Sequence, residues 1–330
     1  MIDTLRKYWN PVATGDEVTT TPIRRRMLGE ELVLWRTEAD GLVSAMKDLC
    51  IHRGAALSGG RVEGNSIVCP YHGWSYARDG ACTRIPSLPE DMPIPKKARA
   101  IAYPVREAFG MIWVAQGENP AAFPSYLEEI EADPAYRICY VKSYDWKTSA
   151  GRVVENAMDF SHFNFVHMGY TELADGPVIK PYEVERSDTG FTYAYDDGHL
   201  LRDYKIEFPF IVHDRKSVVN PAGGKTWSDA GAGSKGDVTL LTFIAAPVDD
   251  VITRIHVLVS RNHSLDRPDS DFTSGFDVIM DQDKVIVESQ RPEEIPTDLK
   301  EELHIRTPDA PAILYRRMLR EIDLPESYLP

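Results

Sequence analysis

The segment CIHRGAALSGGRVEGNSIVCPYHGW, residues 50–74, places two cysteines and two histidines in two short motifs. Cys50 and His52 form the first motif, and Cys69 and His72 form the second, with 16 residues between the motifs. Thiolates and imidazoles are ligands of zinc and of iron–sulfur clusters. A zinc site usually takes like ligands from each loop, whereas each loop here supplies one cysteine and one histidine. The two loops must therefore fold so that they face one metal group.

The mixed pairs favour a two-iron, two-sulfur cluster in which one iron takes both cysteines and the other takes both histidines, which is the Rieske arrangement. Gly54, Pro70 and Gly73 suit tight loops whose backbone N–H groups can point at the sulfurs. The alternative of four unrelated core residues is disfavoured by the spacing and the CPYHGW context. The motif resembles those of Rieske oxygenases and their ferredoxins, because it lacks the extra loop cysteines of cytochrome bc-type Rieske proteins.

The 330-residue chain is long enough for two domains, and its net charge of −14 argues against nucleic acid as a partner. No apolar run approaches the roughly 18 residues that span a bilayer. The N-terminus, MIDTLRKYWNPVA, has no apolar core of a signal peptide. We therefore expect a cytoplasmic protein with no membrane partner. Four cysteines do not form a disulfide framework, and Cys82 and Cys139 are predicted to be buried thiols.

Short β segments with frequent turns fill the first part of the chain and predict a small sandwich or barrel. These segments are 31–37, 42–50, 66–77 and 103–117. Residues 119–136 predict a linker with one short helical turn. We therefore assign residues 1–120 to an N-terminal all-β Rieske [2Fe–2S] domain.

Strands and helices are mixed in residues 121–330, which predicts an α+β protein whose C-terminal catalytic domain is an antiparallel sheet flanked by helices. The expected strands are 136–148, 182–196, 204–212 and 237–262, and the expected helices are 152–169, ending in a loop, 271–290 and 311–322. Residues 220–237 are rich in Gly, Ala and Ser. They predict either a long hairpin loop or a flap over a substrate entrance.

The segment VENAMDFSHFNFVHMG contains the second candidate site. Asp159 and His162 are three residues apart and share a helical face with Asn156. His167 lies about 140° from His162 on an ideal helix, so both can bind one metal only if the helix ends between them. A helix cap or a satisfied polar core is the alternative for two histidines alone. The upstream electron-transfer motif favours the metal.

A two-histidine site needs a carboxylate to complete the facial triad that holds ferrous iron and leaves positions open for oxygen. In the helix predicted over 271–290, Asp283 falls in the middle of an apolar stripe, whereas Asp277 and Asp281 do not. An ionised carboxylate on an apolar face is costly unless it is paired. The partner is either a metal or an arginine elsewhere in the chain, and Glu288 is less well placed.

Together the two constellations resemble the oxygenase component of Rieske non-haem iron oxygenases over most of the chain. The pattern N-x-x-D-x-x-H-x₄-H is met by Asn156, Asp159, His162 and His167, and DKVIVESQRP resembles the carboxylate segment, with Asp283 at the ligand position. The wording SHFNFVHMG is most similar to the toluenesulfonate methyl-monooxygenase and saxitoxin-hydroxylase type. Vanillate and dicamba O-demethylases are more distantly similar.

The resemblance implies one Rieske cluster and one mononuclear Fe(II) per chain, and a homotrimer in which the cluster of one chain serves the iron of the next. By motif position, Asp159 would bridge the iron ligand His162 to His72 of the neighbouring chain, and Asn156 would lie near the open side of the iron. Electrons would come from a separate NAD(P)H-dependent reductase, with or without a ferredoxin. The chain itself has no G-x-G-x-x-G after a strand, so it is predicted to bind no dinucleotide.

The expected function is that of a terminal oxygenase that hydroxylates or oxidatively demethylates a small, aromatic compound, with monooxygenation preferred over dioxygenation. An electron-transfer protein with a non-catalytic docking domain and a zinc-binding structural module are the alternatives. An electron carrier would not need the triad of His162, His167 and Asp283. Residues 200–270 are expected to line much of the pocket. The candidates are the apolar Phe208, Phe210, Phe243 and Ile244 and the polar His213, Arg215 and Arg261.

Overall fold

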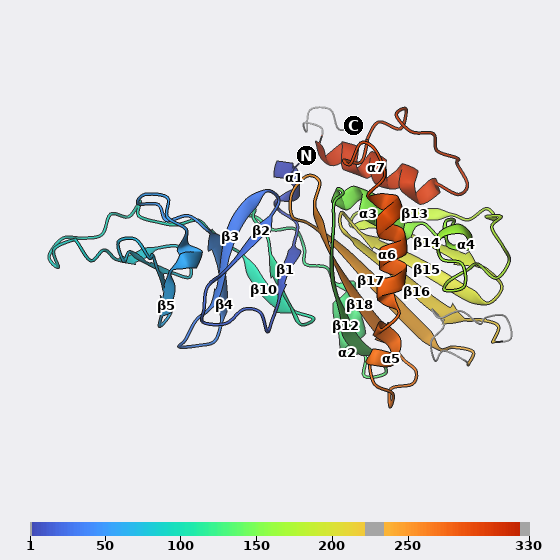
Figure 1. Ribbon diagram of the computed structural model, residues 1–330, viewed down its shortest axis with the longest axis horizontal. Helices are drawn as coiled ribbons and strands as arrows, with labels where there is room; N and C mark the ends of the chain where they lie inside the picture. Colours follow the sequence, from blue (N-terminus) through green and yellow to red (C-terminus); the bar gives the residue numbers. More distant parts are fainter. Residues whose placement is uncertain (1, 222–233, 324–330) are drawn as a thin grey trace. The chain divides into compact units, whose positions relative to one another are not determined.

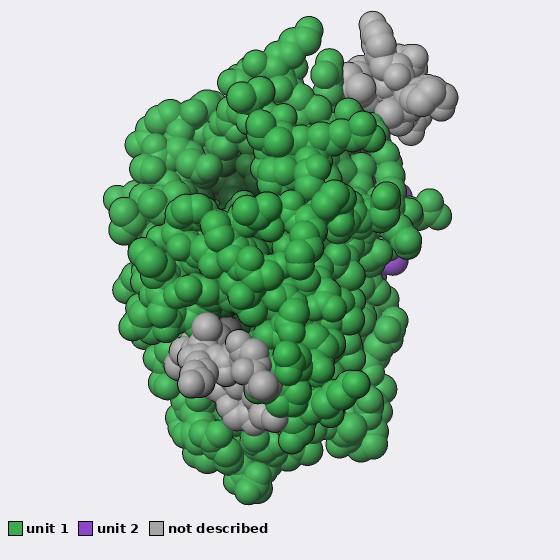
Figure 2. Space-filling model, turned by 90° about the vertical axis from the view of Figure 1, so that its right-hand side faces the viewer, with its two compact units in different colours: residues 1, 124–330 green, residues 2–123 purple. Residues whose placement is uncertain are grey.

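The computed structural model describes residues 2–221 and 234–323, which form two compact units, one over Ile2–Phe123 and one from Pro124 onward. Figure 1 traces the chain through both units, and Figure 2 shows one face of the second unit with a hollow in its surface. No helix in the described residues is long and apolar enough to cross a membrane.

The N-terminal unit is built from short antiparallel strands in three small sheets. The first sheet has the order β1 (Asn10–Thr14), β11 (Met111–Val114), β10 (Val105–Ala108); the second has β2 (Ile23–Met27), β3 (Glu30–Arg36), β4 (Val43–Lys47), β9 (Ala102–Tyr103); the third has β5 (Arg61–Glu63), β6 (Ser66–Val68), β7 (Ser75–Ala77), β8 (Cys82–Arg84). A short helix, α1 (Ile2–Leu5), and a 3₁₀ turn, η1 (Leu57–Gly59), complete the unit. Its core joins Trp35 and Met46 to Cys50, Cys69 and Tyr76, so the cysteine loops emerge from a packed base.

The C-terminal unit is dominated by one antiparallel sheet of seven strands. In spatial order these are β12 (Arg137–Trp146), β18 (Thr253–Arg261), β17 (Val238–Pro247), β16 (Ile211–Val218), β15 (Leu200–Glu207), β14 (Gly190–Asp196) and β13 (Val184–Ser187). The helices are α2 (Tyr126–Ala132), α3 (Ala150–Met158), α4 (Phe163–Val166), α5 (Ser270–Thr273), α6 (Phe276–Val287) and α7 (Ala310–Asp323). The predicted α+β fold, with an all-β N-terminal part, is confirmed.

Helices α3 and α6 cover one face of this sheet (Figure 1), and α3 contacts β16, β17 and β18. The covered face is where a cavity can form between helix and sheet. Side chains alternate between the two faces along each strand, so every second residue of β16 and β17 points toward the helices.

Several of the expected elements divide where the chain turns, and the strand expected over 182–196 is the hairpin of β13 and β14. The strand expected over 204–212 is a hairpin, because Pro209 cannot donate a ladder hydrogen bond and β15 ends before it. The stretch 237–262 is likewise two strands, β17 and β18, and the helix expected over 271–290 is the pair α5 and α6. Most of the loop expected over 220–237 lies outside the described residues. Cys82 and Cys139 are buried free thiols, as predicted.

Candidate metal centres and active-site cavity

The two cysteine loops of the N-terminal unit have the same backbone geometry. The N–H groups of Cys50 and Cys69 each donate to the carbonyl five residues later, at 2.8 Å in both loops. The N–H groups of Gly54 and Gly73 donate back to the cysteine carbonyls at 2.9 and 3.1 Å. Both glycines have a φ of 71°, a left-handed conformation that favours glycine. The two loops therefore have the same backbone conformation at the cysteine and at the glycine that follows the histidine.

The side chains of these loops fit a cluster ligand set. The rings of His52 and His72 have centroids 4.5 Å apart, and Trp74 stacks on His52 at 4.5 Å with an angle of 7°. Cys50 and Cys69 are buried. Within the described part of the chain, Nδ1 of His52 is buried and has no hydrogen-bond partner. Burial, together with nearby positive charge, lowers the pKa of this imidazole, so it stays neutral as a metal ligand must.

A single metal ion does not suit the four loop side chains. Among the described residues, the only group of three or more potential ligand side chains that converge closely enough for one ion is in the other unit. A group that spans two irons therefore fits this site better than zinc, which needs four ligands around one point. The hydroxyl of Tyr76 lies 3.1 Å from Sγ of Cys50. Burial and this contact raise the pKa of Tyr76, so the phenol keeps its proton and can donate to a thiolate.

In the C-terminal unit, the two candidate iron histidines flank a single helical turn. Helix α3 ends at Met158, and α4 begins after His162 and ends before His167. The expected break in the helix is present, although it precedes His162. The expectation that Asp159 and His162 share one helical face is wrong, because Asp159 caps the end of α3. Their contact comes from a tight turn in which Asp159 accepts from the N–H of Ser161 at 2.8 Å.

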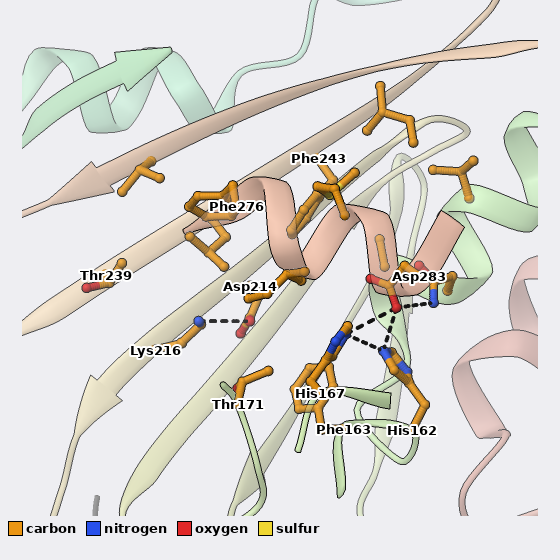
Figure 3. A pocket seen from close by; sticks show the side chains of 18 of the residues that line it. His162, Phe163, His167, Thr171, Asp214, Lys216, Thr239, Phe243, Phe276 and Asp283 are labelled. Carbon is orange, nitrogen blue, oxygen red and sulfur yellow. Dashed lines mark hydrogen bonds and ion pairs between the residues drawn. The ribbon is translucent and has the colours of Figure 1, made fainter. Parts of the chain in front are cut away.

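The structure brings His162, His167 and Asp283 together (Figure 3). The two Nε2 atoms of the histidines are 3.2 Å apart. Oδ1 of Asp283 lies 3.1 Å from Nε2 of His167 and 3.5 Å from Nε2 of His162. Asp283 is on the buried side of α6 with Phe276, Met280 and Val287, as the apolar stripe predicts.

The other nitrogen of each histidine contacts an acceptor. Nδ1 of His162 lies 2.9 Å from Oδ2 of Asp159, and Nδ1 of His167 lies 2.9 Å from Oε1 of Gln282. With its Nδ1 proton donated in this way, each ring presents a lone pair on Nε2. Two lone pairs and a carboxylate oxygen then converge with no proton between them, which a cation would stabilise. The residues therefore fit the mononuclear iron site of a facial triad.

One carboxylate, Asp159, and two amides, Asn156 and Gln282, contact these ligands. Burial by itself raises the pKa of Asp159, but the hydrogen bonds from His162 and Ser161 outweigh it and leave that pKa below its usual range. Asp159 is therefore ionised at neutral pH. Nδ2 of Asn156, on α3, donates to Oδ1 of Asp283 at 3.4 Å. Gln282 was not predicted from the sequence, and its only signal is its place beside Asp283 in α6.

A largely apolar cavity extends from the three ligands between the sheet and α6 (Figure 3). Of the seven pocket residues expected from the sequence, only Phe243 lines it. The side chains of His213 and Arg215 point to the opposite face of β16, where they pair with Glu207 and Asp203. Their neighbours on the cavity face, which were not predicted, are Asp214 and Lys216.

The remaining four expected pocket residues also lie outside the cavity wall. Ile244 alternates with Phe243 and faces the other side of β17. Phe208 is in the turn after β15, and Phe210 is buried next to β16. Arg261 pairs with Asp269 at 2.9 Å. The sequence located the correct strands, but three of the seven expected residues, His213, Arg215 and Ile244, lie on the opposite face of the sheet.

Comparison with known proteins gives the same assignment for both units. Residues 8–104 match the family model of the Rieske [2Fe–2S] domain, and residues 146–323 match the vanillate O-demethylase oxygenase C-terminal domain. The methylxanthine N1-demethylase NdmA of Pseudomonas putida is 31% identical over 96% of this chain and 89% of its own length. The chain is a Rieske oxygenase.

Two further relatives of this Rieske oxygenase differ in how much of the chain they match. The 5,5'-dehydrodivanillate O-demethylase oxygenase subunit of Sphingobium sp. is 33% identical over 58% of this chain and 47% of its own length. A dicamba monooxygenase structure bound to dicamba superposes with a TM-score of 0.80 over 97% of both chains, and its 23% identity shows the shared fold.

The family defines what this Rieske oxygenase carries and needs. It is the terminal oxygenase component of its system, it uses O₂, and it depends on a separate reductase for electrons. The family uses one Rieske [2Fe–2S] cluster and one mononuclear iron. The alternative of an electron carrier with a docking domain is not favoured, because the C-terminal half matches a catalytic domain.

A second cleft of the Rieske oxygenase adjoins the same ligands. It shares Asn156, His162 and Asp283 with the apolar cavity and is also lined by Asp159. Its wall includes the ion-paired Arg152, Glu155, Glu302 and Arg316 and the apolar Ile286 and Leu303. Two of the three candidate iron ligands, His162 and Asp283, therefore line two cavities of different character.

Proposed function

We propose that this Rieske oxygenase acts as a monooxygenase on a methyl group attached to oxygen or nitrogen of a small aromatic compound. Hydroxylation of such a carbon gives a product that loses formaldehyde and leaves the free O–H or N–H. The observation that carries the proposal is the convergence of His162, His167 and Asp283 at one end of an apolar cavity. The demethylase activities in the names of NdmA and of the divanillate relative support it.

In this proposal each candidate ligand has a defined role. His162, His167 and Asp283 hold the mononuclear iron of the domain at 121–330, and the loops of the domain at 1–120 hold the Rieske cluster. The cluster ligands are Cys50, His52, Cys69 and His72. When bound, the two metal groups supply the electrons and the O₂ activation for the hydroxylation.

The protein side chains bind and orient the substrate. Phe243, Phe276 and Met280 line the cavity with apolar surface, which favours an aromatic ring and excludes water. Asn156 holds Asp283 through its amide N–H and leaves its carbonyl for other contacts. Gln282 and Asp159 hold the tautomers of the two histidines, so that both Nε2 lone pairs point to the same place.

We also propose that the chain forms a homotrimer in which Asp159 would bridge His162 of its own chain to His72 of the neighbouring copy. The cluster held by that copy would then supply electrons to the iron held by this chain. Asp159 lines the second cleft, and its side chain is 34% exposed. Leu303, on the wall of the same cleft, is 90% exposed. On the Rieske loops, Ile51 and Tyr71 are exposed beside the cluster histidines. A subunit interface would bury such exposed apolar side chains next to Asp159 and next to the cluster histidines.

The first test is the iron and acid-labile sulfide content of anaerobically prepared protein, for the wild type and Asp283→Ala. We expect about three irons and two sulfides per chain in the wild type, and loss of one iron only in the variant. Equal contents of two irons and two sulfides in both proteins would refute the mononuclear iron site.

The second test measures formaldehyde release and O₂ uptake with a reductase and a panel of methoxy- and N-methyl-arenes. One formaldehyde per substrate consumed supports demethylation, and a ring diol without formaldehyde would contradict it. The cytoplasmic location and the use of a ferredoxin stay predictions from the sequence.

A further inference from the structure

Two charged side chains interrupt the apolar wall of the active-site cavity. Asp214 and Lys216 lie two residues apart on β16 and therefore point to the same face of the sheet (Figure 3). Their side chains are each 5% exposed, and Nζ of Lys216 is 4.0 Å from Oδ2 of Asp214. Charged groups at this depth are costly unless they are paired or have a use.

One atom of this pair has no partner in the protein. Within residues 2–221 and 234–323, Oδ1 of Asp214 is buried and accepts no hydrogen bond. Oδ2 accepts from Nη1 of Arg202 at 3.4 Å. A buried carboxylate oxygen without a donor is unfavourable, and this one belongs to a side chain that lines the cavity. A ligand that enters the cavity with an N–H or O–H group would satisfy it.

Charged side chains already surround this atom. Among the described residues, Asp214 and Asp197 both lie beside Arg202, at 3.4 and 3.7 Å, and Nζ of Lys216 lies 4.0 Å from Oδ2 of Asp214. A carboxylate on the substrate would place a second negative charge against Oδ1 of Asp214, whereas a neutral N–H or O–H group would not.

We propose that Asp214 and Lys216 select a neutral substrate that carries an N–H or O–H next to a carbonyl on one edge of its ring, as a lactam, imide or cyclic urea does. Asp214 only accepts and Lys216 only donates, so the pair matches adjacent donor and acceptor atoms. The inference rests on the proposed function, because it assumes that the cavity between α6 and the sheet holds the substrate.

The opposite wall supports this orientation. Phe276, Ile279 and Met280 on α6 line the same cavity, with the iron ligand Asp283 further along that helix. A ring bound by its polar edge to β16 would lie between these walls. A methyl group elsewhere on the ring could then face His162, His167 and Asp283. The polar pair would thus determine which methyl group reacts, and not only which compound binds.

The test uses matched probes that differ at one edge. Theobromine has an N–H between two carbonyls, and caffeine has N–CH₃ at that position; 3-methoxybenzamide is neutral, and 3-methoxybenzoate is an anion. Titration calorimetry on the anaerobic, cluster-loaded protein measures each dissociation constant without turnover. We expect theobromine to bind about tenfold more tightly than caffeine, because a site that accepts a hydrogen bond from the ligand's N–H rejects an analogue without that N–H. We expect the amide to bind about tenfold more tightly than the benzoate, because the benzoate lacks the N–H and carries a negative charge.

Substitution of the pair supplies the decisive comparison. Asp214→Asn keeps the shape but removes one negative charge, so both ratios should fall toward one and benzoate binding should improve. Lys216→Met should weaken binding of every carbonyl-bearing probe. Asp203→Asn is the matched control, because Asp203 pairs with Arg215 on the opposite face and should leave both ratios unchanged. Thermal unfolding and iron content check that each variant is folded and loaded.

Three results would overturn the inference. The wild type could bind the benzoate more tightly than the amide, or Asp214→Asn could leave both affinity ratios unchanged. In the third result, the wild type binds none of the four probes. A measurement of formaldehyde release distinguishes failure of this inference from failure of the proposed function. A protein that demethylates 3-methoxybenzoate without the expected preference refutes the substrate class only. A protein that binds as expected but releases no formaldehyde from any methylated probe refutes the demethylation.

Discussion

The hydrogen bond from His167 to Gln282 makes a specific prediction about iron affinity. Oε1 of Gln282 lies 2.9 Å from Nδ1 of His167, whose side chain is 1% exposed, so water does not replace it easily. In Gln282→Leu the ring can instead keep its proton on Nε2 and donate to Asp283, which is 3.1 Å away. That tautomer must be lost before a metal binds, so the variant should hold iron less tightly.

The expected loss is about 10–100-fold in Fe(II) affinity, the usual effect of removing an outer partner of a ligand histidine. This corresponds to about 1.4–2.8 kcal/mol. The assay is an anaerobic competition titration against a coloured Fe(II) chelator on protein with an intact Rieske cluster. The visible spectrum of the cluster reports that the other unit is unaffected.

Gln282→Glu is the matched control, because a carboxylate keeps the acceptor at the same distance along the side chain. It should retain or increase the affinity. An affinity of Gln282→Leu within twofold of wild type would refute the reasoning. Equal losses in the leucine and glutamate variants would also refute it, since they would show that packing and not the acceptor matters.

Two shorter predictions concern the path of the electrons. Asp159→Asn should leave the cluster assembled but lower coupled turnover by at least about tenfold, because the ionised carboxylate that holds Nδ1 of His162 is lost; normal turnover in a reductase-coupled assay would exclude the bridging role. Tyr76→Phe should lower the cluster potential, because the phenol no longer donates to Sγ of Cys50. A differential of about 1 kcal/mol between the oxidation states is roughly 40 mV for one electron, and protein-film voltammetry that finds no decrease would contradict this.

The sequence by itself predicted the ligands of both centres. A thiol and an imidazole in each of two loops predict the ligand set of a Rieske cluster, because ligand type and short spacing are local properties. His162 and His167 are equally local, since five residues separate them. Asp283 could be chosen because an ionisable side chain in the apolar stripe of a helix needs a partner. These inferences need no knowledge of how distant segments pack.

Only the tertiary structure decided which other residues surround these centres. Strand alternation in β16 offers two sets of side chains, and no local pattern favours Asp214 and Lys216 over His213 and Arg215. The choice is made by α3 and α6, which cover one face of the sheet and turn it into a cavity wall. The contact of Gln282 with His167 likewise joins residues 115 positions apart. Such contacts depend on the packing of whole elements, which no local pattern specifies.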